Sequence, residues 1–115
     1  MNLFSKQEKI CRDLKDLHGL ATSLGNQGTI LRHYDNLKGA LQRFNEQEKI
    51  CRELKDAKSL AVSIANQALV LRQQGHVRRA TKLANDALFI TQAQGYLVLE
   101  KNIQAIVDEI TQEGD

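Results

Sequence analysis

The sequence predicts an all-α fold, an α-solenoid in which antiparallel helix pairs stack side by side, with about six helices in total. Three observations predict it. A 40-residue unit occurs twice without a gap, apolar residues within each copy recur every three or four positions, and the chain has no Pro and few aromatic residues. A repeat of this length is typical of helical arrays, and the low aromatic content disfavours a β-sandwich.

The repeat is visible in the sequence letters. The segment QEKICR at residues 7–12 returns at residues 47–52, and aligning residues 4–40 with residues 44–80 gives 18 identical pairs out of 37. Identity at about half of the positions over an ungapped stretch excludes a chance match. A third, weaker copy begins at Ala80 and runs towards the C-terminus, so the repeat organises the chain.

Local signals predict where each helix begins and ends. Asp16 and Asp56 are suited to cap the helices that follow them, because a carboxylate accepts hydrogen bonds from the first free N–H groups. Gly75 and Gly95 are expected to end helices, since Gly adopts positive φ at little cost. Between these signals, apolar residues line one helical face. The predicted helices span residues 3–15, 17–33, 36–54, 57–74, 76–94 and 96–112.

These helices are expected to form a single domain of residues 1–115. Its parts are a half repeat at 3–15, repeats at 17–54 and 57–94, and a C-terminal capping helix at 96–112. The connections are short, so consecutive helices must be antiparallel. The first helix corresponds to the second helix of a repeat whose first helix is missing. The last helix has a broader apolar face than we expect of a capping helix. The ends predict a piece of a longer array or a chain that associates with itself.

Composition and charge exclude several classes of function. Sixteen basic and fourteen acidic side chains give a net charge of +2, so we expect no nucleic-acid partner and no membrane binding. Apolar runs are too short for a membrane span or a signal peptide, and we expect a cytoplasmic protein. Cys11 and Cys51 are expected to be reduced and packed between helices. The sequence has no metal-ligand spacing and no catalytic set, so we expect no enzyme activity, metal or cofactor.

The second copy resembles a tetratricopeptide repeat. In that family the first helix carries a large residue, a small residue four positions later and a large residue three positions after that. A Gly closes this helix, and the second helix has small residues five and twelve positions beyond the Gly. The residues at these positions are Ile64, Ala68, Leu71, Gly75, Ala80 and Ala87.

The first copy departs from this pattern at two places. Asp35 stands at the Gly position, where Asp tolerates the left-handed backbone better than most residues. Gln47 stands at the second small position, where we expect wider helix packing. The period and the long second helix are similar to the extended repeats of kinesin light chains and of the cell-polarity adaptors that bind spindle proteins.

The resemblance implies that a concave groove binds a peptide or helix of another protein. Asn26 and Asn66 occupy the position that faces the groove in this family and hydrogen-bonds the backbone of an extended ligand. An amide suits that task because it offers both a donor and an acceptor. Arg32 and Arg72 lie six residues further along, near the expected rim, where they can pair with acidic groups. The other expected groove residues are Thr22, Thr29, Val62 and Leu69.

We therefore expect a non-catalytic interaction module with a protein or peptide partner. The alternative is a designed or truncated repeat fragment with a structural role, which would form a homo-oligomer through its terminal helices. The oligomeric state distinguishes the two, because a strict monomer at all concentrations disfavours self-association.

Overall fold

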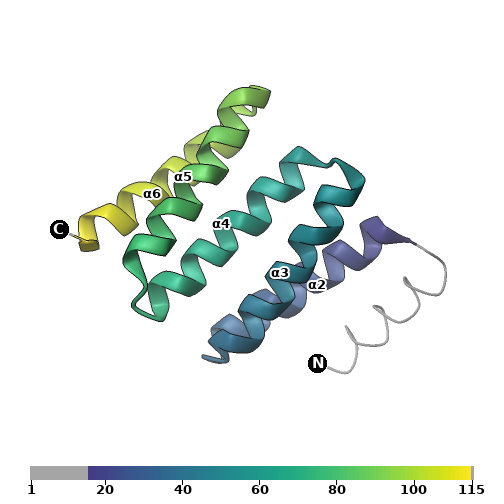
Figure 1. Ribbon diagram of the computed structural model, residues 1–115, viewed down its shortest axis with the longest axis horizontal. Helices are drawn as coiled ribbons and strands as arrows, with labels where there is room; N and C mark the ends of the chain where they lie inside the picture. The colour runs from purple at the N-terminus through teal and green to yellow at the C-terminus, as the bar shows by residue number, and fades with distance from the viewer. Residues whose placement is uncertain (1–15, 115) are drawn as a thin grey trace.

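The computed structural model describes residues 16–114, and within this range it contains five α-helices and no strand (Figure 1). The all-α prediction is confirmed, and each of the five helices begins and ends within two residues of its predicted bounds. The helix predicted at residues 3–15 lies outside the described residues. None of the helices in the described range is long and apolar enough to cross a membrane. The helices are α2 (Leu17–His33), α3 (Leu37–Leu54), α4 (Ala57–Gln73), α5 (Val77–Gln94) and α6 (Leu97–Gly114).

Each helix packs against the next one along the chain, and consecutive helices run in opposite directions (Figure 1). Alternate helices also meet, because α2 contacts α4 and α4 contacts α6. No Cα atoms of α3 and α5 lie within 8 Å of each other in the part of the chain that the structure describes. The helices α2, α4 and α6 therefore form a continuous row, whereas α3 and α5 are separated from each other.

The four turns between these helices share one backbone design. Each contains a single residue with positive φ, namely Asp35 (62°), Lys55 (56°), Gly75 (89°) and Gly95 (72°). The N–H of the following residue bonds to the carbonyl five positions back, as in His76 N to Leu71 O at 2.8 Å. This is the Schellman arrangement that commonly ends helices. Helix ends at Gly75 and Gly95 are confirmed, and Asp35 takes the left-handed conformation expected of it.

The residue after each left-handed position also precedes the next helix, so each turn ends one helix and starts another. The side chain of Asp16 accepts a hydrogen bond from Gly19 N at 2.9 Å, and that of Asp56 accepts one from Ser59 N at 3.1 Å. Both predicted caps are confirmed. Asn36 caps α3 in the same way, whereas His76 forms no side-chain cap bond with α5.

The two helix pairs differ in the sizes of the side chains that meet between their helices. Gly28 of α2 lies against Phe44 of α3, so closely that a Cβ at Gly28 would lie 2.6 Å from the ring. The equivalent residues of the next pair are Ala68 and Ala84, which share one buried cluster. Gln47, where wider packing was expected, fits because Gly25 faces it: a Cβ at Gly25 would lie 2.6 Å from the Gln47 amide nitrogen.

Candidate protein-binding face

The candidate site is formed by one stripe of side chains on each of α2, α4 and α6, the three helices that meet in a row. The positions i, i+4 and i+7 lie on one side of a helix. On each of these helices, three positions with that spacing are exposed or half-buried. We call them the α2–α4–α6 face: Thr22, Asn26 and Thr29 of α2; Val62, Asn66 and Leu69 of α4; and Asn102, Ile106 and Glu109 of α6.

Two amides occupy the middle of this face. Asn26 is exposed on α2, and Asn66 is half-buried at the equivalent position of α4. Neither side chain forms a hydrogen bond within the described part of the chain, so each keeps its donors and its acceptor for another partner. Because α2 contacts α4, the two amides belong to neighbouring helices of one surface.

The threonine hydroxyls on α2 have partners in their own helix. Thr22 donates to His18 O at 3.1 Å, and Thr29 donates to Gly25 O at 3.0 Å. A hydroxyl that donates to the carbonyl one turn earlier presents its methyl group and its lone pairs, not a free O–H. Thr22 and Thr29 thus supply small, weakly accepting positions on either side of Asn26.

The two predicted rim arginines connect neighbouring helices of the row. Arg32 Nη1 donates to Gln73 Oε1 at 2.9 Å, which joins α2 to α4. Arg72 Nη1 lies 2.8 Å from Glu109 Oε1, which joins α4 to α6. The sequence places both arginines at equivalent positions, and in the structure each reaches the next helix of the row. Their partners differ in charge, because one is a neutral amide and the other a carboxylate.

The centre of the face is partly apolar. Val62 and Leu69 are half-buried on either side of Asn66, and Ile106 of α6 is half-buried at the position equivalent to Asn66. From its sequence, α6 was expected to serve only as a capping helix, and no groove residue was predicted on it. The 40-residue repeat could have indicated these residues, because Asn102, Ile106 and Glu109 are the repeat equivalents of Val62, Asn66 and Leu69.

The opposite side of α6 is polar. On α4, the residues Ala61, Ile64, Ala68 and Leu71 are buried in the cluster that includes α5. Their equivalents on α6 are Lys101, Gln104, Asp108 and Thr111, none of which is buried. Gln104 donates from Nε2 to Asp108 Oδ1 at 2.9 Å, and the Thr111 hydroxyl lies 2.9 Å from Val107 O. At these four positions α6 therefore has polar side chains where α4 has apolar ones.

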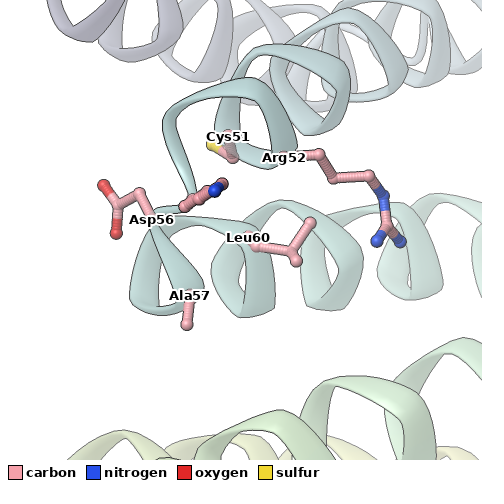
Figure 2. Close-up of a pocket in the computed structure, with 6 residues that line it drawn as sticks. Cys51, Arg52, Asp56, Ala57 and Leu60 are labelled. Atoms are coloured by element: carbon pink, nitrogen blue, oxygen red, sulfur yellow. The ribbon is translucent and has the colours of Figure 1, made fainter.

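A pocket of about 250 Å³ lies between the end of α3 and the start of α4, and none of the face residues lines it (Figure 2). Burial, with the carboxylates of Asp56 and Glu48, raises the pKa of the Cys51 thiol to about 11. Arg52 pairs with Glu48 at 2.9 Å. The pocket therefore combines a protonated thiol with a guanidinium already paired, which is unsuited to nucleophilic catalysis. Its lining residues are Cys51, Arg52, Lys55, Asp56, Ala57 and Leu60.

Among the described residues, no group of three or more His, Cys, Asp or Glu side chains is placed so that it could hold a metal ion. His18, His33 and His76 are exposed and lie near helix ends. Cys51 is buried, as predicted for a small residue packed between helices. The other cysteine, Cys11, lies outside the described residues.

No protein-family model and no curated protein matches this chain.

Proposed function

We propose that this chain is a non-catalytic interaction module that binds a peptide or helix of another protein along the α2–α4–α6 face. The observation that carries the proposal is the pair of free amides, Asn26 and Asn66, at equivalent positions of two contacting helices. Two such amides provide donors and acceptors suited to the peptide groups of a ligand. The half-buried Val62 and Leu69 beside Asn66 provide shallow apolar contacts.

The packing of the helices supports a curved stack of the tetratricopeptide type. Backbones in the row α2, α4, α6 approach each other closely, whereas no Cα atoms of α3 and α5 lie within 8 Å of each other in the described range. Helices that approach each other more closely belong to the inner side of a curved array. We therefore infer that the α2–α4–α6 face is concave, which suits the binding of an elongated ligand.

A peptide selection tests this proposal with a defined probe. Random dodecapeptides displayed on phage are selected against the unmodified protein, and the enriched peptides are synthesised and measured by fluorescence anisotropy. The double variant Asn26→Ala/Asn66→Ala should bind them roughly tenfold more weakly or worse, because each lost hydrogen bond costs about 0.5–1.5 kcal/mol. Asn26 is exposed and Asn66 is half-buried, and neither side chain forms a hydrogen bond within the described residues, so the variant should fold normally.

The repeat provides a matched control. Asn45 and Asn85 are also repeat equivalents, and both are exposed on α3 and α5, outside the face. The variant Asn45→Ala/Asn85→Ala removes the same number of amides and should bind as the unmodified protein does. Equal binding by the two double variants would rule out the α2–α4–α6 face as the binding site.

Self-association is the second candidate function, and one observation favours it. Phe89 at the end of α5 and Val98 at the start of α6 are 71 % and 76 % exposed. The equivalent residues one repeat earlier are Lys49 and Lys58, so these exposed apolar side chains are particular to the last two helices. Light scattering coupled to size exclusion should detect a dimer if the residues associate, and Phe89→Lys/Val98→Lys should abolish it.

A further inference from the structure

We infer that the outer surface of α3 and α5 binds the surface of an anionic lipid bilayer, with basic side chains on the headgroups and Phe89 at the boundary with the acyl chains. This inference goes beyond the proposed function, because it assigns a partner to helices that the α2–α4–α6 face does not use. Its basis is an uneven distribution of exposed charge among the helices and one exposed aromatic ring among the basic residues.

The outer surface consists of one exposed stripe on each of α3 and α5. On α5, each buried core residue, such as Ala80 or Ala84, lies two positions beyond an exposed one, and two positions correspond to about 200° around a helix. The exposed stripe therefore points away from the core that α5 shares with α4 and α6. On α3 the same relation holds. The outer stripes are Lys38, Gln42, Asn45 and Lys49 of α3, and Arg78, Lys82, Asn85 and Phe89 of α5.

Exposed charges are distributed unevenly between these two helices and the row. In the described range, α3 and α5 expose six basic and two acidic side chains, whereas α2, α4 and α6 up to residue 111 expose two of each. The expectation of no membrane partner rested on the net charge of the whole chain, which does not reveal this local excess. The exposed charged residues of α3 and α5 are Lys38, Lys49, Arg52, Arg78, Arg79, Lys82, Glu53 and Asp86.

Most of these basic side chains are available to an anionic partner. Arg52 already pairs with Glu48 at 2.9 Å. The others form no ion pair with any described residue, namely Lys38, Lys49, Arg78, Arg79 and Lys82. Each Lys or Arg near an anionic bilayer increases partitioning about fivefold, so several on one surface suit a partner that presents many negative headgroups.

Phe89 adds an apolar contact to the basic stripe of α5. Its ring is 71 % exposed, and it lies seven residues beyond Lys82 on the same side of the helix. Basic residues together with an exposed Phe are typical of helices that lie in the membrane interface. Nucleic-acid phosphates attract the same cations, but a single ring forms no stacking platform for bases. The combination therefore favours a bilayer over a nucleic acid.

The arrangement of the two helices also suits a planar partner. Consecutive helices are antiparallel, so α3 and α5 run in the same direction, and the repeat makes Lys38 equivalent to Arg78. No Cα atoms of the two helices lie within 8 Å of each other in the described range, so their outer stripes spread the basic residues over a broad surface. A bilayer bound there leaves the α2–α4–α6 face open to a peptide.

Vesicle flotation tests the inference with the unmodified chain. Vesicles of phosphatidylcholine alone are compared with vesicles that also contain about 30 mol % phosphatidylserine, at salt concentrations from about 50 to 300 mM. The protein should float with the anionic vesicles, should stay behind when the vesicles are neutral, and should dissociate as the salt concentration rises. Flotation separates bound protein from aggregated protein, which sinks.

Two charge variants test the position of the binding surface. Arg78→Gln/Lys82→Gln should lower the partition coefficient roughly thirtyfold, because two cations near the bilayer are lost. Lys58→Gln/Lys101→Gln removes the same charge from exposed positions on α4 and α6, and should lower partitioning less than about threefold. Urea unfolding should give both variants the midpoint of the unmodified protein.

A second pair of variants tests the aromatic contact. Phe89→Ser should lower binding to anionic vesicles roughly fivefold or more, because the ring no longer enters the interface. Val98→Ser is the matched control. Val98 is 76 % exposed, but it lies one turn before Asn102 and therefore on the side of the α2–α4–α6 face. This variant should bind as the unmodified protein does.

Three results would overturn the inference. The first is a protein that does not float with anionic vesicles at low salt, and the second is an equal loss in the two variants of either pair. The third is retardation of a DNA duplex without vesicle binding, which would assign the basic surface to nucleic acid. Asn26→Ala/Asn66→Ala should float normally, so a failure of peptide binding would leave this inference standing.

Discussion

Gln67 of α4 donates a hydrogen bond from Nε2 to Oε1 of Glu48 on α3, at 2.7 Å. One repeat further along, the equivalent residues are Val107 of α6 and Leu88 of α5, which belong to or pack against the apolar core. The same contact between neighbouring helix pairs is therefore polar in one interface and apolar in the next. The chain itself thus provides an apolar replacement with which the contribution of the polar pair can be measured.

We expect Glu48→Leu alone to destabilise the fold and Glu48→Leu/Gln67→Val to restore or raise stability. The single change leaves the amide of Gln67, which is 5 % exposed, without its acceptor, at a cost of about 1–3 kcal/mol. The double change recreates the apolar pair, and such replacements are often neutral or stabilising. Urea unfolding measures the free energies. Glu53→Leu, at an exposed position of α3, controls for the added leucine. Additive effects of the two single changes would contradict the prediction.

The contact between Gly28 and Phe44 gives a second prediction. Gly28→Ala should destabilise by about 1–3 kcal/mol, because the new methyl group overlaps a ring that is 1 % exposed. Gly25→Ala should cost less, since its neighbour is the mobile end of the Gln47 side chain. Thermal unfolding compares the two. If Gly28→Ala is the milder change, the Gly28–Phe44 contact is looser than the structure shows.

A third prediction concerns the turn after α3. Lys55 has a φ of 56°, whereas its repeat equivalent Gly95 has a φ of 72°. A left-handed backbone costs a residue with a Cβ about 1–2 kcal/mol, part of which is offset because Gly loses more entropy on folding. Lys55→Gly should therefore stabilise by about 1 kcal/mol, and Gly95→Lys should destabilise by a similar amount. Denaturant midpoints test both, and a change of the same sign in both variants would refute the explanation.

The fourth prediction is a loss of stability at acidic pH that depends on Asp56. Hydrogen bonds from Ser59 hold the pKa of the Asp56 carboxyl below its ordinary value of 3.8, and His18 lowers it further. Because the folded pKa lies below the unfolded one, the contribution is present above pH 3.8 and is lost as the pH falls through the folded pKa. Asp56→Asn keeps an N-cap acceptor and should flatten this part of the curve.

Urea midpoints between about pH 2 and 6 provide the measurement. Asp86→Asn removes an exposed acid from α5 and corrects for the general effect of one negative charge. An acid-side slope that is the same in the Asp56 and Asp86 variants would show that the cap does not contribute.

The parts of the structure that were predictable from sequence depend on neighbouring residues. Asp16 and Asp56 bond to N–H groups three residues away, and Gly75 and Gly95 satisfy a local backbone requirement, so these signals are readable in a short window. Lys55 was not predicted to be left-handed, because lysine has no intrinsic preference for that conformation. Only its equivalence to Gly95 could have indicated it.

The features of the site that were missed depend on residues distant in sequence. The contacts of Arg32 with Gln73, 41 residues away, and of Arg72 with Glu109 on α6 were not predicted, and a role of these arginines in ligand binding remains a prediction. Side-chain partners across a helical row depend on packing and not on local pattern. The α6 stripe was missed because its buried residues, such as Ile103 and Val107, replace Ser63 and Gln67 and obscure the repeat.

The last prediction is that Cys51 reacts slowly with thiol reagents in the folded protein. Its pKa is raised from 9.0 to about 11, so at pH 8 the folded state contains about a hundredfold less thiolate than the unfolded chain. The variant Cys11→Ser leaves Cys51 as the single thiol. Its reaction with a disulfide reagent, followed by absorbance, should be at least tenfold slower in buffer than in concentrated urea.

Asp56→Asn removes a carboxylate that raises the pKa of Cys51, so it should accelerate the native reaction without altering the rate in urea. Equal native and denatured rates in Cys11→Ser would mean that the pocket beside Cys51 admits the reagent and that the thiol ionises as it does in water.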